Sequence, residues 1–527
     1  MGRKKIRKEL GRRSMSRLHE ASVVLCVLAL SATARAQQQP GQPPSGTPGA
    51  APARDTAQTE TADLDVGGHL GYANLDELNY VMPVLAADLR LSIFQTAFRI
   101  PLRFQIDTGD IREADWDEVG DFFRVSACSR LDVSASGRFE REHGFCQPWA
   151  VEHEDYYFTV RAAPLYDFAL GHGTIVAHYS NNIDPDHFHP GLVADFQLNR
   201  FVTGHFFLDD ATNPSLLGGT FALRPFAYLR EDAGAQYEQT HQLELGVTAV
   251  SDLRAPDRIR TAFGLALATP ERNLVYTTAP VTALGGHFHY RYAFGQQIEA
   301  EGRIDWNWIS EGGMGGHTQL VFIYNHPDGD YSWRGLGEVR YMQESYVPTY
   351  FDSYYDIQRQ QYTLTDEARQ AVDTGDAPFI TKLEFLRRLP DGWYGGYRLG
   401  LAFEAFTGEG DERRPVFQTR LSVGDNFGRD ADGQFVLTAG LTRLGRKIDV
   451  FALYSRQSFD TLLDVFQLED TLVKVFVRWD LNAQFYVLID YGRIWQLRAD
   501  ADDGVARASG FSSGNDFHIS LGFAEGL

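Results

Sequence analysis

The sequence predicts an all-β protein, built as one large antiparallel transmembrane β-barrel with few short helices in its loops. Three observations predict this fold: most of the chain alternates apolar and polar residues, the alternating segments are long, and aromatic residues gather at the ends of these segments. A period of two residues places successive side chains on opposite faces of a strand. We expect about 18 such strands, with a margin of about two, because strand boundaries are the hardest feature to place from a sequence.

The alternation is clearest in residues 298–308, where Ile298, Ile304 and Trp306 share one face while charged residues occupy the other. The same pattern recurs in residues 397–404 and 473–480. Charges of both signs are costly in a dry core but acceptable in a water-filled lumen. The charged residues that we predict to face the lumen are Glu299, Glu301, Arg303, Asp305, Arg398, Glu404, Lys474 and Arg478.

The length of the strands favours a barrel in a membrane over a soluble β-sandwich or propeller. A strand that crosses a bilayer at a tilt needs about 9–11 residues, whereas strands of globular proteins average about five or six. Aromatic residues such as Trp306, Trp308, Trp393 and Tyr394 lie where the interfacial girdles of a membrane barrel are expected. A soluble secreted β protein is the alternative.

The N-terminal 36 residues read as a secretory signal peptide, with a basic start, a short apolar run at 21–30 and Ala34-Arg35-Ala36 before the cleavage point. Residues 37–63 are rich in Gln, Pro and Gly and predict a disordered linker. The barrel is expected to occupy residues 64–527. The signal peptide holds nine Lys and Arg against two Glu, so the chain charge of −21 becomes −28 after its removal. This acidity argues against a nucleic-acid partner.

Taken together, these features resemble Gram-negative outer-membrane β-barrel proteins of a porin-like, uncharacterised family. The resemblance is carried by the alternating C-terminal strand at 516–523 and by residues 164–168, 171–174 and 178–182. The last residue departs from the family pattern, because Leu527 stands where such proteins typically end in an aromatic residue. The resemblance implies location in the outer membrane, contact with lipid and lipopolysaccharide, insertion by the barrel-assembly machinery, and a homo-oligomer as one arrangement.

The function that this resemblance implies is a porin-like channel for small solutes or ions, and a non-enzymatic role is favoured. Two alternatives stay open: a plugged barrel that acts as an outer-membrane enzyme or surface-binding protein, and a soluble secreted β protein. The long connection at 343–378 is expected either to fold into the lumen as a constriction or to form an ordinary loop. We predict a short helix at 365–372, and a further strand near 353–362 if long and short connections alternate.

Two groups of side chains suggest local chemistry. Cys128 and Cys146 are predicted to form a disulfide, because the chain is exported and no other cysteine follows the signal peptide. The second group could bind a divalent cation, although a solvated loop is favoured because the spacing matches no known ligand motif. It consists of His187, His189, Asp184 and Asp186. No other cofactor is expected.

Overall fold

The structure is a computed structural model of the full chain. It describes residues 63–75, 78–90, 94–101, 104–105, 128–134, 157–163, 165, 168–181, 191–198, 201–228, 241–262, 265–268, 275–295, 297–327, 329–360, 380–389, 392–407, 414–427, 433–444, 447–459, 464–466, 471–482, 485–500 and 506–526. The predicted signal peptide and almost all of the predicted linker lie outside these residues, as do the predicted helix at 365–372 and all four predicted metal ligands at 184–189.

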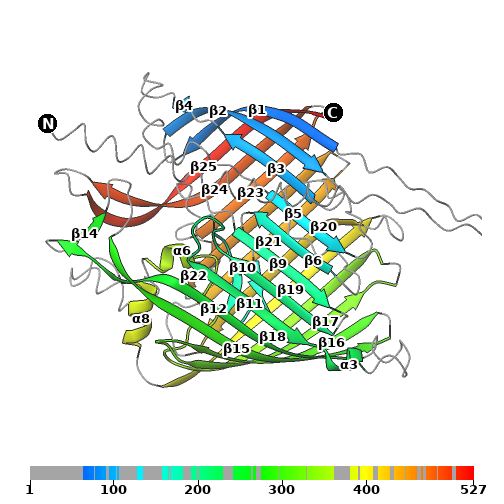
Figure 1. The fold of residues 1–527 in the computed structure, drawn as a ribbon, viewed down its shortest axis with the longest axis vertical. Helices are drawn as coiled ribbons and strands as arrows, with labels where there is room; N and C mark the ends of the chain where they lie inside the picture. Colours follow the sequence, from blue (N-terminus) through cyan, green and yellow to red (C-terminus); the bar gives the residue numbers. More distant parts are fainter. Residues whose placement is uncertain are drawn as a thin grey trace, which may run out of the picture. The chain divides into compact units, whose positions relative to one another are not determined.

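Antiparallel strands make up most of the described chain (Figure 1). The first half of the wall consists of β1 (Asp63–Leu75), β2 (Leu78–Arg90), β3 (Phe94–Pro101), β5 (Cys128–Ser134), β6 (Tyr157–Ala163), β9 (Gly191–Leu198), β10 (Val202–Leu208), β11 (Leu216–Leu223), β12 (His241–Ile259) and β15 (Tyr276–Phe294). The second half consists of β16 (Ile298–Ile309), β17 (Met314–Asn325), β18 (Tyr331–Gln343), β19 (Trp393–Thr407), β20 (Arg414–Asn426), β21 (Gly433–Leu444), β22 (Ile448–Phe459), β23 (Thr471–Asp480), β24 (Phe485–Asp500) and β25 (Ala506–Gly526).

Each of these strands pairs with the next, and the ring closes where β1 pairs with β25 from Asp65 opposite Gly526 to Leu75 opposite Asp516. In Figure 1 the blue β1 and the red β25 accordingly lie side by side. The sheet has 23 strands, of which β4 (Phe104–Gln105), β13 (Thr261–Ala262) and β14 (Leu265–Ala268) are short extensions, so twenty described strands form the ring. The predicted all-β antiparallel barrel is confirmed, and the strand number falls within the predicted margin.

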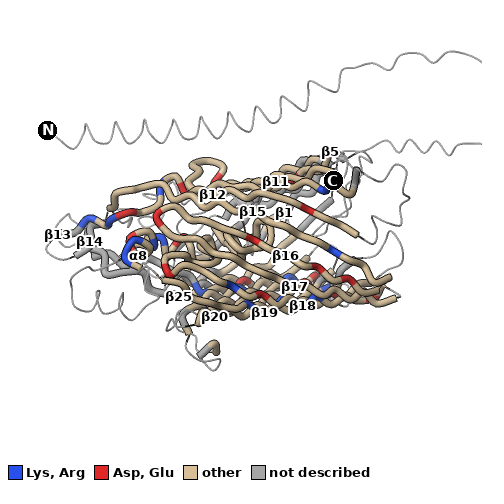
Figure 2. The backbone as a smooth tube through the Cα atoms, turned by 90° about the horizontal axis from the view of Figure 1, so that it is seen from below, with Lys and Arg blue, Asp and Glu red and all other residues tan. Residues whose placement is uncertain are grey.

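The two faces of the wall differ as the alternation predicts. On β16, Trp306 is 52% exposed, whereas its neighbour Asp305 is 4% exposed. The exposed face of the wall carries large apolar side chains, and the buried face carries the charges. Figure 2 marks acidic and basic residues along the strands near β16, β18 and β19. The apolar face is therefore the outside of the barrel and the charged face its inside.

Aromatic side chains on the outer face gather near both rims of the wall. At the rim where β18 ends, Tyr341 stacks on Trp393 with ring centroids 4.8 Å apart. At the opposite rim, Trp333 packs on Phe403 at 4.5 Å. Aliphatic residues such as Val339, which is 67% exposed, lie between the two rims. The outer surface is thus an apolar band with aromatic residues at its edges.

We call the rim at the start of β1 and the end of β25 the terminal end, and the opposite rim the distal end. Strand order places the connection 344–392 between β18 and β19 at the distal end, together with the connection 164–190. Residues 353–360 contain helix α6 (Tyr355–Gln358) and no strand, so the strand predicted near 353–362 is not found there. The seven strands β19 to β25 that follow this connection place it at the same end as the connections after β20, β22 and β24, so the alternation needs no further strand.

Short helices occur only between strands in the described part of the chain: α3 (Pro225–Tyr228), α6, α8 (Lys382–Arg388) and the 3-10 turn η2 (Asp464–Phe466). Thr381 is the N-cap of α8, because its hydroxyl accepts a 3.0 Å hydrogen bond from the backbone N–H of Glu384. None of the described helices is long and apolar enough to cross a membrane.

Candidate metal centre inside the barrel

A small hairpin from the distal end folds into the barrel. Its strands are β7 (Phe168–Leu170) and β8 (Val176–Tyr179), and its turn contains Gly171 and Gly173 with φ of 59° and 71°. Glycine suits these positive φ values because it has no Cβ to clash. Phe168 at the base of the hairpin is buried and packs on Phe207 of β10, with ring centroids 4.8 Å apart. Burial of these rings fixes the hairpin against the wall.

A second segment, the connection 344–392 between β18 and β19, also folds inward; we call it the insert. Several large side chains of its described residues are fully buried, among them Tyr346, Tyr350 and Phe351. Backbone hydrogen bonds join it to the hairpin, because Phe351 N–H donates to Ile175 and Ala177 N–H donates to Phe351, each at 3.2 Å. Of the two arrangements expected for this connection, the inward fold is the one seen in residues 344–360 and 380–389.

Six inward side chains form a belt around the middle of the wall, one from each of six adjacent strands from β12 to β19. Each is the register partner of the next, so the belt is a continuous row of neighbours that runs across the six strands. Neighbours of this kind have Cβ atoms about 4.5–5.5 Å apart and interact directly. The belt consists of Glu244, His289, Arg303, Gln319, Glu338 and Arg398.

Glu338 on β18 is the central residue of the part of this belt that β17, β18 and β19 form. Its carboxylate accepts from Arg340 Nε at 2.6 Å, from His317 Nδ1 at 2.9 Å and from Gln319 Nε2 at 3.0 Å, and it also pairs with Arg398. A buried carboxylate needs this number of partners to offset its lost hydration. Arg398 in turn donates from Nη1 to the carbonyl of Gly173 at 3.0 Å. The hairpin turn is therefore tied to the charged wall.

The turn also brings His172 to the other side of the belt. His172 Nδ1 lies 3.0 Å from both carboxylate oxygens of Asp305 on β16. Its ring stands edge-on to His287 and His289, with centroids 4.7 and 5.5 Å away. Burial lowers the pKa of His172, although Asp305 opposes this shift, so the imidazole is neutral at neutral pH. A neutral imidazole keeps one nitrogen lone pair available for a ligand.

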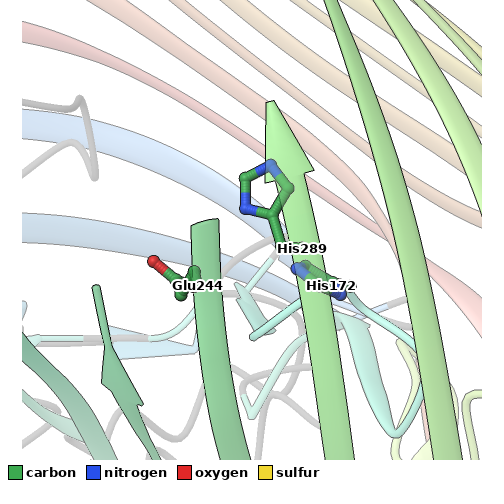
Figure 3. A group of neighbouring side chains, drawn as sticks. All are labelled: His172, Glu244 and His289. Atoms are coloured by element: carbon green, nitrogen blue, oxygen red, sulfur yellow. The ribbon is translucent and has the colours of Figure 1, made fainter. Parts of the chain in front are cut away.

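His172, Glu244 and His289 form a candidate metal centre (Figure 3). Each offers a ligand atom, and the three atoms all lie within 4.8 Å of one another. They come from three separate elements: the hairpin turn, β12 and β15. Glu244 and His289 face each other across the β12–β15 pair, and His172 reaches them from inside the barrel. Two imidazoles and one carboxylate are typical ligands of Zn²⁺.

The residues predicted to face the lumen have different surroundings. Glu301 and Arg303 pair on β16, Lys474 pairs with Asp490 at 3.1 Å, and Arg478 pairs with Asp480 at 2.8 Å. Asp305 and Arg398 hold the hairpin turn, as described above. Glu299 pairs with Arg291 at 2.7 Å, while Glu404 lies opposite Ser332 on β18 and is partly exposed. Their shared role in the electrostatics of a pore stays a prediction.

Two histidines on either side of the four predicted metal ligands have separate surroundings in the structure. His172 joins the candidate metal centre, while His205 pairs with its cross-strand neighbour Asp195. His187 and His189 lie outside the described residues, and so does Cys146, the predicted disulfide partner of Cys128. No sequence motif connects His172 to Glu244 and His289. The inward fold of the hairpin brings them together.

No protein-family model matches the chain, and no curated protein matches it in sequence. Solved structures that match include the outer membrane protein opdK from Pseudomonas aeruginosa, with 8% identity, a TM-score of 0.28, and coverage of 89% of this chain and 99% of that one. Pseudomonas aeruginosa OccK11 (OpdR) has 9% identity, a TM-score of 0.30, and coverage of 88% and 96%. The siderophore receptor PirA from Acinetobacter baumannii has 8% identity, a TM-score of 0.35, and coverage of 89% and 81%. The chain is thus similar to outer-membrane β-barrels, while its own barrel fold rests on the strand pairing above.

Proposed function

We propose that the protein is a solute channel of the outer membrane, narrowed toward its distal end by the hairpin and the insert. The observation that carries this proposal is the contrast along the inner face of β18. The side chain of Arg334, toward the terminal end, is 45% exposed, whereas that of Glu338, at the level of the belt, has no exposed surface. Water therefore reaches the inner wall from one end, and the inserted segments cover it further along.

Location in the membrane is supported by the outer surface. An apolar band flanked by aromatic residues is the pattern of a barrel wall in lipid. The strands β16 to β19 have 12 to 15 residues, which is long enough to cross a bilayer at a tilt. Lipid and lipopolysaccharide would contact this band. Membrane fractionation tests the location: we expect recovery with the outer membrane, and recovery in the soluble fraction would exclude it.

Conduction is tested by recording from the refolded full chain in a planar bilayer under a salt gradient. We expect small single-channel currents, because the inserted segments occupy part of the interior. Cations should be preferred over anions, because the charge of the chain without its signal peptide is strongly negative. A preference for anions, or the absence of current from both the full chain and a variant without the insert, would contradict the proposal.

A plugged barrel that binds a ligand is the second candidate, and one observation favours it. The hairpin and the insert share a continuous apolar core with wall residues that include Phe207, Val281 and Met342. Such a core is stable and resists opening. A plugged barrel would pass no current as the full chain but would conduct once the insert is replaced. That pair of results separates it from the narrowed channel.

A further inference from the structure

We propose that His172, Glu244 and His289 bind one divalent transition-metal ion, for which Zn²⁺ is the best fit, and that this ion fastens the hairpin to the barrel wall. The site is separate from the histidine-rich residues at 184–189 that the sequence suggests. It also does not depend on conduction, because it rests only on the placement of three side chains.

The geometry of the three groups is close to that of a zinc site. Tetrahedral ligands at about 2.0–2.1 Å from Zn²⁺ are about 3.4 Å from one another. The ligand atoms of His172, Glu244 and His289 lie within 4.8 Å of one another, so the separations must shrink by at most about 1.4 Å. Rotation of the Glu244 and His289 side chains on their strands, and of the His172 side chain on the hairpin turn, would supply this movement. Glu244 and His289 are held at facing positions in a regular antiparallel pair, so two ligands are already positioned.

The surroundings orient each ligand. His172 directs Nδ1 at the Asp305 carboxylate, which leaves Nε2 for the metal; histidine ligands almost always donate their other nitrogen to such a group. Arg224 Nε donates to Oε2 of Glu244 at 2.8 Å and leaves Oε1 on the side of the histidines, 3.5 Å from His287 Nε2. Nε2 of His289 is buried, makes no hydrogen bond, and lies 3.5 Å from the Glu301 carboxylate.

The type of ligand selects the metal. Imidazole nitrogens favour Zn²⁺, Cu²⁺ or Ni²⁺ over Ca²⁺ and Mg²⁺, which prefer oxygen ligands. Three protein ligands leave a fourth tetrahedral position for water. The carboxylates of Asp305 and Glu301 lie beside two of these ligands and offset part of the positive charge of the ion. We therefore expect Zn²⁺ to bind in preference to Ca²⁺.

A bound ion would add a third attachment to the hairpin turn. The turn is already held by Asp305 through His172 and by Arg398 through the Gly173 carbonyl. Each of these side chains holds the turn to one strand, β16 or β19, whereas an ion would connect the turn directly to two strands. The expected consequence is that the metal reduces local opening of the hairpin.

The experiment uses the refolded full chain, stripped of metal and titrated with Zn²⁺ by calorimetry and with Co²⁺ by visible absorption. We expect one ion per chain and the strong absorption of four-coordinate Co²⁺. His172→Ala, Glu244→Gln and His289→Ala should each weaken binding at least tenfold. His241→Ala is the matched control on β12: it lies beside Tyr290 at the edge of the strand and should bind as the parent does.

Two further measurements decide the remaining cases. Zn²⁺ binding should persist in the double variant His187→Ala and His189→Ala. Loss of Zn²⁺ binding in this double variant, together with unchanged binding in His172→Ala, would overturn the proposal. Absence of Zn²⁺ binding by the parent chain would overturn it as well. Hydrogen exchange at residues 168–181 should slow on adding Zn²⁺ to the parent chain and stay unchanged in His172→Ala. Equal slowing in both would show that the ion does not fasten the hairpin. None of these results depends on whether the barrel conducts.

Discussion

The two halves of the barrel interior are built from the same strands but differ in what covers them. Toward the terminal end, the inward pair Arg291–Glu299 keeps 31% and 14% of its side-chain surface exposed. At the level of the belt, Glu338 and its partners are buried beneath the hairpin turn. The wall carries inward charges of both signs in both places. The inserted segments therefore decide whether an inward charge faces water or a packed interior.

This difference changes the energy of equivalent ion pairs. An exposed pair contributes about 0–1 kcal/mol, because water screens it and ordering the side chains costs entropy. Removal of one partner from a buried pair costs about 3–5 kcal/mol, because the remaining charge cannot return to water. Substitutions in the two halves should therefore have different effects, although the sequence alternation that positions them is the same.

The largest effect on stability is expected from Phe351→Ala in the insert. This side chain is fully buried and packs on Tyr350 and Tyr355, with ring centroids 5.0 and 4.8 Å away. Loss of the ring should cost about 3–5 kcal/mol through lost burial and a new cavity. Hydrogen exchange at residues 346–358 measures the change. Phe466→Ala is the control, because Phe466 is 76% exposed; equal effects of the two substitutions would contradict the packed insert.

A similar loss is expected from Glu338→Ala. It would leave Arg340 and Arg398 buried without their carboxylate, at a cost of about 3–5 kcal/mol. Urea unfolding in detergent micelles measures the change in free energy of unfolding. Glu299→Ala, on the partly exposed pair, should cost less than about 1 kcal/mol. If the two variants were equally stable, the interior at the level of Glu338 would have to be hydrated.

A smaller, pH-dependent effect is expected at Lys382 on α8. Its Nζ donates to the Tyr350 carbonyl at 2.7 Å and to Gln358 at 2.9 Å, and burial lowers its pKa despite the nearby Asp352. Between the lowered pKa and about 10.4, the unfolded segment binds more protons than the folded one. Local stability should therefore rise with pH in this window, by at most about 1.4 kcal/mol per pH unit.

Hydrogen exchange at residues 380–389, corrected for the intrinsic exchange rate, tests this dependence between pH 7 and 9.5. Burial raises the pKa of Tyr350, so its ionisation in the unfolded segment would oppose the trend above about pH 10. Lys382→Met should remove the slope. A fall in stability across the window, or an equal slope in Lys382→Met, would show that Lys382 is not the group responsible.

The smallest effect is expected from Arg291→Gln at the partly exposed pair. It should change the free energy of unfolding by less than about 1 kcal/mol. Salt screens exposed charges. The difference from the parent chain should therefore shrink between about 0.05 and 1 M salt, because the Debye length falls over this range from more than about 10 Å to about 3 Å. A larger, salt-independent loss would place this pair in a packed interior.

The alternation predicts the barrel wall well because each strand can be recognised from its own residues alone. On β16 it separates Ile304 and Trp306 from Arg303 and Asp305 without knowledge of any neighbour. The belt is harder to predict, because a slip of one residue in the β12–β15 register would turn His289 away from Glu244. Residues 353–360 resemble a strand in composition, but their aromatic side chains are buried against the inside of the wall. Tertiary packing determines the conformation of such segments, and no local sequence pattern reveals that packing.

The most direct test compares single-channel currents of the full chain with those of a variant in which residues 346–389 are replaced by a short Gly-Ser linker. Both proteins should run as folded barrels on unheated gels before recording. We expect small currents from the full chain and a severalfold larger conductance from the variant, because the insert fills part of the interior. Equal conductance in the two, or no current from either folded barrel, would contradict a channel narrowed from within.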